Sequence, residues 1–287
     1  MGNIRIVTDS SAQFLNPDVL ARYGIHVVPH RVRFGHEVLR EGVDLDADGF
    51  FRRILTDGAP MPVLEGPSVE AYITVLNDLA QETDSILVLP MASGMGVSYA
   101  NARAAAETVR GRCDVVVLDS MTASVGLAFL AETAARAAQS GASLEGVVRQ
   151  VRSAIPRVYA VFYVETLDYL FRAHLIGEAQ SILGKILGIK PFLTIEDGRL
   201  VTMEKVRTRV QAVDKLLEYV LEFSEIEQLV IVQNTPHVTD QTRLIIERLT
   251  LEFGRRDYPV MMYGASLGTF LGPDGVGIVI YEAEEED

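Results

Sequence analysis

The sequence predicts an α/β protein whose first half forms a parallel sheet with helices on both faces. Four short runs rich in β-branched residues, "IRIVTDS", "IHVVPHRVRF", "SILVLP" and "DVVVLDS", are nearly continuous in apolar residues, as strands buried on both faces are. Helical patterns lie between and after them, at residues 46–56, 67–80, 97–110 and 123–139. Alternating strands and helices indicate a three-layer α/β/α domain.

One segment interrupts this alternation. In "RVRFGHEVLREG", Gly35 and His36 stand between two short extended runs, and this arrangement predicts a β-hairpin.

The second half begins a new block with a strand. After a helix expected at 143–154, "RVYAVFYVETL" reads as a strand, and "KPFLTIEDGRLVTMEKV" as two strands around the turn at Asp197 and Gly198. A helix at 207–223, "EQLVIVQNT", a helix at 238–253, "YPVMMYG" and "GVGIVIYE" follow. We therefore expect two domains, 1–156 and 157–287, divided near Pro156.

Composition narrows the class of protein. The 287 residues are 48% hydrophobic and 23% charged, as in a globular protein, with a formal net charge of −13. That charge argues against nucleic-acid binding, which needs clustered Lys and Arg. The single cysteine, Cys113, opens the apolar run "CDVVVLD" and is expected to be a partly buried, inert thiol.

The chain ends give an expected location. The start "MGNIRIVTDS" lacks the apolar region of a signal peptide, and no apolar run is long enough to span a membrane. The acidic "EAEEED" at the end is expected to fray in solvent. The sequence therefore predicts a cytoplasmic protein without stable membrane insertion.

Three predicted strands of the first half end in turns that carry hydroxyl groups. Thr8 to Ser11 follow the first strand, Ser93 follows "SILVLP", and Asp119 to Thr122 follow "DVVVLDS". Strands in a parallel sheet present these ends at one edge, where open α/β sheets bind ligands. The Asp and Ser side chains either contact a ligand there or cap the following helices, and the sequence leaves both open.

The turn after "SILVLP" is the strongest candidate for a ligand contact. The strand breaks at Pro90, and the chain passes Ser93 and Gly94 before an alanine-rich helix. Free N–H groups at the positive end of a helix dipole suit an anionic or polar group.

Other chemistry finds no support in the sequence. "SGMG" is neither a Walker loop nor a dinucleotide fingerprint, and HExxH, CxxC and GxSxG motifs are absent. The histidines show no metal-ligand spacing: His26, His30, His36, His174 and His237. We predict no metal, no cofactor and no catalytic residue. The small residues of helix 123–139 either allow close packing or leave room for a long apolar ligand.

At this point the motifs resemble those of the DegV family. "IVTDSSAQF" is similar to its opening motif, and "YGIHVVPHRVRFGHEVLREGVDL", "VVVLDSMTASVGLAFL" and "GIKPFLTIEDGRLVTMEKVRTRVQAVDKL" are similar to three further blocks. The resemblance implies the EDD fold, with a parallel first domain and a two-layer second domain with a mixed sheet. It also implies a fatty-acid tunnel near the domain junction and a carboxylate presented to a separate fatty acid kinase.

The head-group positions depart from the family pattern. Ser93 is retained, although Ala92 replaces the serine before it. The resemblance places polar residues at three further positions, which here hold Leu64, Leu175 and Phe270. Asp274 stands where the family has a glycine.

Three consequences of these departures stay open. His174, beside Leu175, could donate a hydrogen bond in place of the lost arginine. The lipid head could be neutral or protonated, or lipid binding could be lost. The expected ligand contacts are therefore Ser93, Gly94, Ser10, Ser120 and His174.

Two other functions compete with lipid binding. The first is an enzyme acting on a small hydroxylated or phosphorylated substrate, because a related domain occurs in dihydroxyacetone kinases. The second is a protein-interaction module, with Arg207 and Arg209 marking a docking face on an acidic chain.

Overall fold

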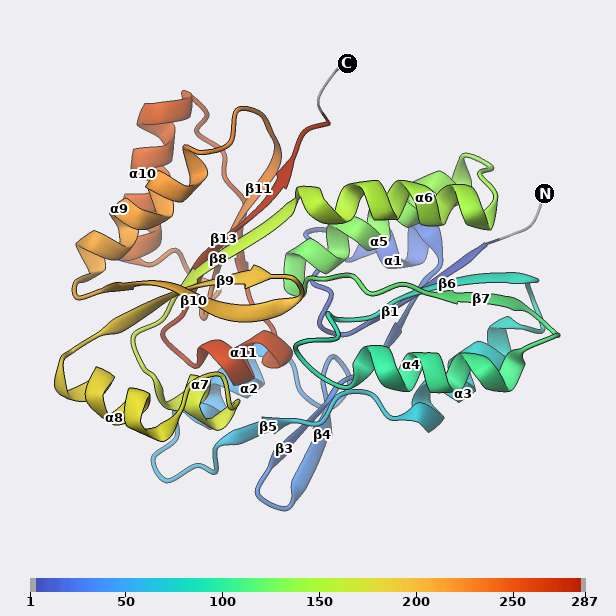
Figure 1. Ribbon diagram of the computed structural model, residues 1–287, viewed down its shortest axis with the longest axis horizontal. Coiled ribbons are helices and arrows are strands. Elements are labelled where there is room, and N and C mark those ends of the chain that lie inside the picture. Colours follow the sequence, from blue (N-terminus) through green and yellow to red (C-terminus); the bar gives the residue numbers. More distant parts are fainter. Residues whose placement is uncertain (1–3, 285–287) are drawn as a thin grey trace.

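The computed structural model describes residues 4–284, and its first sheet is the predicted parallel one (Figure 1). All neighbouring strands of this sheet are parallel. Their order is β2 (Ile25–Val28), β1 (Arg5–Asp9), β6 (Ser85–Leu89) and β7 (Asp114–Val117). The carboxyl ends of β1, β6 and β7 therefore lie at one edge, as the sequence predicts.

Helices cover both faces of this sheet. Val7 and Val88 face α3 (Val69–Leu79) and α4 (Ser98–Ala106), whereas Ile6 and Leu87 face α5 (Ser124–Gln139). The second layer also contains α1 (Asp18–Tyr23) and α6 (Leu144–Ala154). Side chains of alternate residues point to opposite faces of a strand, so both faces of the apolar runs are buried.

The second sheet is mixed and carries helices on one face. Only β11 and β12 are parallel neighbours within it. Its strand order is β10 (Arg199–Val206), β9 (Lys190–Glu196), β8 (Val158–Tyr163), β13 (Val276–Glu282), β11 (Ile226–Gln233) and β12 (Val260–Met262).

Two helices, α9 (Arg209–Val220) and α10 (Asp240–Phe253), pack on one face of this sheet. The strand side chains on this face include Val161 and Ile278. The other face, through Phe162 and Val279, packs toward the first domain. The two-domain α/β class is therefore confirmed.

The α5 helix is the central element between the two sheets. It contacts β1 of the first sheet and β8 and β13 of the second. A Cβ atom on Gly126 would lie 2.7 Å from Cγ1 of Val158, so the absence of a side chain is required there. The small residues of this helix thus serve close packing, which was one of the two predicted alternatives.

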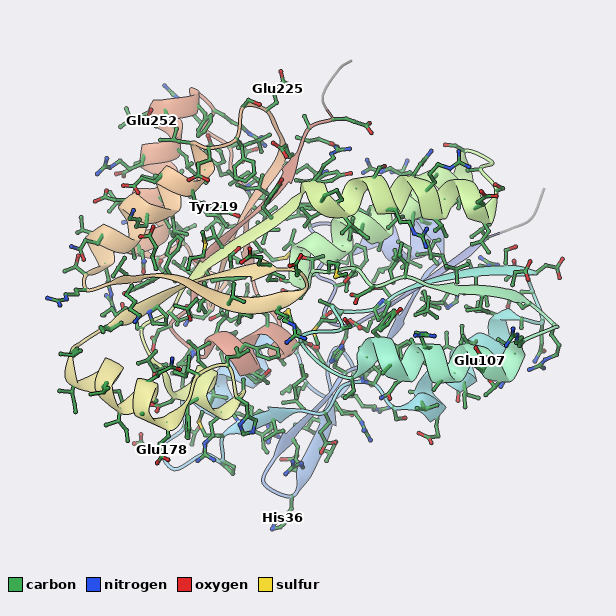
Figure 2. All side chains as sticks on the ribbon, viewed as in Figure 1. His36, Glu107, Glu178, Tyr219, Glu225 and Glu252 are labelled. Atoms are coloured by element: carbon green, nitrogen blue, oxygen red, sulfur yellow. The ribbon has the colours of Figure 1, made fainter. Side chains whose placement is uncertain are left out.

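A third, antiparallel sheet contains the predicted hairpin. Its strands are β4 (Glu37–Arg40), β3 (Arg31–Phe34) and β5 (Pro62–Leu64). Figure 2 shows His36 projecting from the hairpin tip. Reading "IHVVPHRVRF" as one strand was wrong, because β2 ends at Val28 and β3 starts at Arg31 in another sheet. Pro29 separates them, since it has no N–H for the ladder.

Several short elements were not predicted. The structure contains α2 (Ala47–Ile54), which was expected, and the 3-10 turn Glu107–Val109, which ends the helix expected at 97–110. The helices that were not predicted are α1, α7 (Asp168–Arg172), α8 (Glu178–Ile186), α11 (Ala265–Leu271) and the 3-10 turn Ile155–Arg157. Helices of five to nine residues are too short for a clear 3.6-residue period. The domain limit near Pro156 stays a prediction, and Pro156 lies in the second 3-10 turn.

Three further expectations concern Cys113, membrane-spanning helices and the acidic residues at the end of the chain. Cys113 is buried, and burial raises the pKa of its thiol, which disfavours the reactive thiolate. Within residues 4–284, no helix is both long and apolar enough to cross a membrane. Of the acidic end, Glu282 closes β13, and residues 285–287 lie outside the described residues.

Candidate head-group site

Residues 92–95, which we call the Ser93 turn, link β6 to the loop before α4. Ser93 and Gly94 are exposed. The Ser93 N–H donates to Oδ1 of Asp119 at 3.1 Å, and Asp119 also accepts the Met121 N–H at 3.1 Å. Within residues 4–284, the Ser93 hydroxyl and the Gly94 N–H form no hydrogen bond. The turn therefore offers two free donors to a ligand.

The β9–β10 hairpin of the second domain lies against this turn. A Cβ atom on Gly94 would lie 2.6 Å from the carbonyl oxygen of Gly198 and 2.5 Å from Cγ of Arg199. Gly198 itself is buried, and its own Cβ would lie 3.4 Å from Cβ of Ala92 and 3.0 Å from Sδ of Met121. The two glycines thus allow the two domains to meet at the Ser93 turn.

Asp9, at the end of β1, is fully buried and holds the loop that contains the Ser93 turn. Its carboxylate accepts the Met91 N–H at 2.8 Å and the Ser98 hydroxyl, at the two ends of this loop. It also accepts the N–H and hydroxyl of Ser11, at 3.1 and 2.5 Å. Asp9 therefore fixes where the Ser93 turn begins and ends.

His30 and Tyr72 complete this buried group. We call it the Asp9 cluster, and it consists of Asp9, Ser11, His30, Tyr72 and Ser98. His30 Nε2 lies 3.2 Å from Oδ1 of Asp9, but neither ring nitrogen has a well-aligned hydrogen bond, so the contact is chiefly an ion pair. The Tyr72 hydroxyl lies 2.6 Å from Oγ of Ser98. Every member is inaccessible to solvent or nearly so.

Burial and charge act against each other in the Asp9 cluster. Burial disfavours the charged forms of Asp9 and His30, but their attraction outweighs it. The pKa of Asp9 is therefore lowered and that of His30 raised. Burial also raises the pKa of the Tyr72 hydroxyl well above its ordinary value. The cluster is a closed ion pair with hydrogen-bonded neighbours.

Of the two alternatives for the Asp and Ser side chains at the sheet edge, capping was wrong. The residues before α1, α4 and α5 are Pro17, Val97 and Ala123, and none forms a side-chain cap. Asp9 and Asp119 instead accept N–H groups of the loops at the sheet edge.

Ser10 links the two domains through a buried acid. Its hydroxyl accepts the His30 N–H at 2.8 Å and donates to Oε2 of Glu41 at 2.8 Å. Glu41 also accepts the N–H of Ser266, at the start of α11, at 2.9 Å, and the Ser266 hydroxyl. The predicted contact of Ser10 with a ligand stays a prediction, and in this conformation its hydroxyl serves the link.

Ser120 and His174 lie in different surroundings. The Ser120 hydroxyl is buried and donates to the carbonyl of Thr122 at 3.0 Å. His174 is exposed after α7 with φ 58°, and no hydrogen bond joins its ring to Ser93 within residues 4–284. Of the five predicted contacts, only Ser93 and Gly94 present unoccupied donors at one place.

The sequence analysis did not predict that the carboxylates of Asp9 and Glu41 would hold the loops at the carboxyl edge of the first sheet. Asp9 follows directly on a buried apolar strand, "RIVTD", and this position was a usable signal. Nothing local marks Glu41, because its partner Ser266 is 225 residues away.

The positions that depart from the family pattern are apolar in their surroundings as well. Phe270 is buried, and Leu64 and Leu175 are half-buried against the same core. The core that these residues share also includes Leu89 and Met91 at the end of β6. Ala92 and Met95 of the turn belong to this core as well, so an apolar core adjoins the Ser93 turn beside the polar Asp9 cluster.

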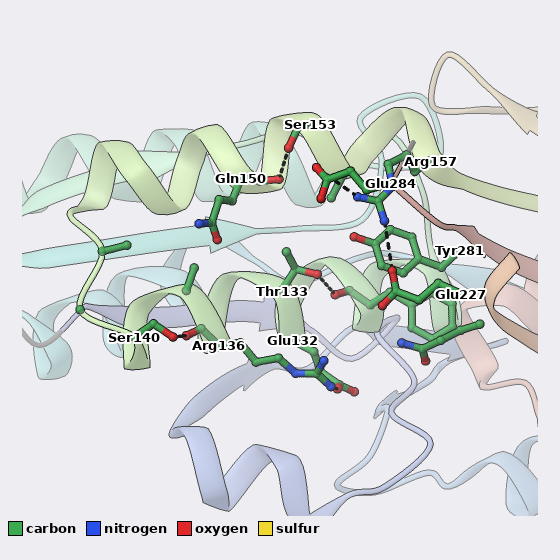
Figure 3. Close-up of a pocket in the computed structure, with 16 residues that line it drawn as sticks. Glu132, Thr133, Arg136, Ser140, Gln150, Ser153, Arg157, Glu227, Tyr281 and Glu284 are labelled. Atoms are coloured by element: carbon green, nitrogen blue, oxygen red, sulfur yellow. Dashed lines mark hydrogen bonds and ion pairs between the residues drawn. The ribbon is translucent and has the colours of Figure 1, made fainter. Parts of the chain in front are cut away.

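Two cavities lie away from the Ser93 turn. The cavity in Figure 3, about 730 Å³, lies between α5, α6 and the second sheet and is lined by polar side chains such as Arg136, Gln150 and Glu227. A smaller one, about 350 Å³, adjoins Ser10 and Glu41. Ser93, Leu64 and Phe270 line neither of them.

Fold and site define a two-domain α/β protein with a polar turn at the domain junction beside an apolar core. The sequence profile described as "Uncharacterised protein, DegV family" matches residues 3–283. A DegV domain-containing protein of Caldanaerobacter subterraneus subsp. tengcongensis is 32% identical over 98% of this chain and 100% of its own length. The chain belongs to the DegV family.

Solved structures agree with this assignment. The DegV family protein of Thermus thermophilus, which binds fatty acid, superposes with a TM-score of 0.85 at 26% identity, covering 98% of this chain and 100% of its own. DegV of Bacillus subtilis, a fatty acid binding protein, gives 0.84 at 25% identity with the same coverage.

Proposed function

We propose that this protein binds a long-chain fatty acid with its carboxyl group at the Ser93 turn. The observation that carries the proposal is the place of the two free donors, the Ser93 hydroxyl and the Gly94 N–H, at the junction of an apolar core with solvent. Two relatives of the same fold, at 25 and 26% identity, bind fatty acids.

The energetics suit an acyl chain beside Leu64, Leu175 and Phe270. Burying about 14 methylenes would favour binding by roughly 11 kcal/mol before ordering costs. A carboxylate buried among these side chains would lose its hydration without replacement. The head group therefore belongs at the turn and the chain in the apolar core.

The core has to open to admit the chain, and α8 is a helix that can move at little cost. Only Ser181 and Gly184 of this helix are buried, whereas Leu183 and Ile186 are 58% and 74% exposed. Moving α8 would expose little new apolar surface, so its displacement costs less free energy than that of α5 or α11.

We further propose that the protein is a cytoplasmic binding subunit that presents the carboxylate to a separate kinase. The exposure of Ser93 supports this idea, because a partner could reach a head group bound there. The buried Asp9 cluster has no access to a substrate. Of the two arginines proposed for docking, Arg209 is held by Glu165, and the Arg207 side chain is free within residues 4–284.

The test is denaturing extraction of the purified protein with mass spectrometry of the released lipid, beside a mock purification. We expect a stoichiometric long-chain fatty acid. Ser93→Ala should weaken binding of added palmitate by about tenfold through loss of one hydrogen bond to a charged group. The matched control is Ser224→Ala, another exposed serine whose hydroxyl forms no hydrogen bond within residues 4–284.

A protein that carries no lipid and takes up neither palmitate nor a neutral analogue would refute lipid binding. A neutral lipid in stoichiometric amount would refute presentation of a carboxylate to a kinase.

A further inference from the structure

The three positions where the family pattern has polar residues near the head group carry no positive charge in this chain. Leu64, Leu175 and Phe270 pack into hydrocarbon. Asp119, whose carboxylate accepts the Ser93 N–H, adds a negative charge instead. An ionised fatty acid on Ser93 would therefore be repelled by Asp119 unless a cation lies close by.

Arg199 is the cation that lies against this turn. Its Cγ would be 2.5 Å from a Cβ on Gly94, so its stem crosses directly over the backbone of the turn. Because the terminal nitrogens of the guanidinium lie only four bonds beyond Cγ, the group stays in the neighbourhood of Gly94. Arg199 comes from the second domain, which explains why the sequence around Ser93 gives no sign of it.

The hairpin fixes this position firmly. Asp197 and Gly198 both have positive φ, 48° and 71°, as in the tight turn that joins two twisted strands. Gly198 is buried against Ala92 and Met121, so the tip is anchored on the first domain one residue before Arg199. The arginine stem therefore has little freedom to leave the turn.

The charge of Arg199 is not neutralised within the protein. Its side chain is exposed and forms no hydrogen bond or ion pair within residues 4–284, although Glu196 is its direct partner across the hairpin. Arg209, by contrast, is held by Glu165. A free guanidinium beside two free donors is suited to a carboxylate, which accepts hydrogen bonds on both oxygens.

We propose that Arg199 binds the anionic head group of the lipid at the Ser93 turn and selects ionised fatty acids over neutral lipids. This inference rests on the proposed function. It assigns to the second domain the positive contact that Leu175 cannot supply, and so differs from the substitution by His174 considered above.

The test compares palmitate with hexadecanol, its neutral analogue, in competition with a fluorescent fatty acid at pH 8. Arg199→Gln should weaken palmitate binding by about tenfold, as expected for a partly screened charge-assisted hydrogen bond, and change hexadecanol binding less than about twofold. Arg199→Lys should restore part of the loss. High salt should weaken palmitate binding to wild type more than to Arg199→Gln.

Arg256→Gln is the matched control, and His174→Ala tests the other candidate for the head-group contact. Arg256→Gln removes the same charge from an exposed arginine that has no partner within residues 4–284, and it should leave the binding of both ligands unchanged. His174→Ala should also leave both unchanged, because Arg199 supplies the cation.

The outcomes separate the two proposals. Equal effects of Arg199→Gln on both ligands, or no effect on either, would overturn the role of Arg199 and leave lipid binding standing. Loss of palmitate binding in His174→Ala but not in Arg199→Gln would also overturn it. A wild type that binds neither ligand would overturn the proposed function and this inference together.

Discussion

The Asp9 cluster and the Ser93 turn occupy the same edge of the first sheet, yet they differ in how their polar groups are satisfied. Asp9 is buried and has four hydrogen-bond donors and an ion-pair partner, His30. The Ser93 hydroxyl is exposed and has no hydrogen-bond partner in the part of the chain that the structure describes. Satisfied groups hold a structure together, whereas free groups beside an apolar core are available to a ligand.

The difference also explains how one region depends on the other. Asp9 accepts hydrogen bonds from Met91 and Ser98, and the Ser93 turn lies between these two residues. The first region is therefore the support of the second. Variants of the Asp9 cluster should act mainly on stability, and variants of the turn mainly on ligand binding.

The largest effect is expected for Asp9→Asn. The change leaves His30 buried without its counterion. Because the amide keeps one oxygen, it also removes the acceptor of two of the four donors, so the free energy of unfolding should fall by about 3 kcal/mol. Urea unfolding followed by circular dichroism measures this. Glu107→Gln, which breaks only an exposed ion pair with Arg110, is the control. A loss below about 0.5 kcal/mol would contradict the supporting role of Asp9.

Next in size is Gly94→Ala. Its Cβ would overlap the carbonyl oxygen of Gly198, a backbone atom that cannot rotate away, so the hairpin has to shift. Overpacking of this kind should cost about 2 kcal/mol and weaken palmitate binding at the same time. Gly146→Ala in α6, where the nearest atom would be 3.4 Å away, should not destabilise the protein. An unchanged Gly94→Ala protein would show that the two domains do not meet closely there.

A smaller effect in the opposite direction is expected for Asp119→Asn. The amide oxygen can still accept the N–H groups of Ser93 and Met121, so the turn keeps its shape, but a negative charge is lost. Affinity for palmitate should rise by about threefold, and affinity for hexadecanol should not change. Weaker palmitate binding would mean that the carboxylate of Asp119 helps to hold the lipid.

The smallest effect concerns pH. Because the pKa of His30 is raised in the folded protein, protonated His30 stabilises the fold below about pH 6.5. This stabilisation is lost as the pH rises through the folded pKa. Because the pKa of Asp9 is lowered, its carboxylate stabilises the fold above about pH 4, and this stabilisation is lost in acid. The groups facing His30 are Asp9 and Glu41.

Wild type should therefore lose more stability than His30→Gln between pH 6 and pH 9, as measured by urea unfolding. Parallel curves for the two proteins would mean that His30 is neutral throughout.

Most of the first domain could be predicted from the sequence because its signals are local. Continuous β-branched runs marked β1, β6 and β7, and long periodic patterns marked α3 and α5. The break after Val28 was missed because Pro29 was read within one apolar run. The α11 helix was missed because all seven of its residues are buried, so its short sequence does not divide into an apolar and a polar face.

The candidate site was predicted only in its local part. Ser93 and Gly94 follow one strand and could be found by inspection. Arg199 and Ser266 reach this edge from the second domain, through a hairpin tip and a helix start whose positions depend on how the two domains pack. No pattern along the chain records such packing.

The most direct test of the account is the ionisation state of the bound head group. Palmitate labelled with ¹³C at its carboxyl carbon, bound to the wild-type protein, reports ionisation through its chemical shift. We expect an ionised carboxylate at pH 7, with a pKa lower than in Arg199→Gln, because the guanidinium favours the charged form. A carboxyl group that is protonated at pH 7, with the same pKa in both proteins, would contradict the account.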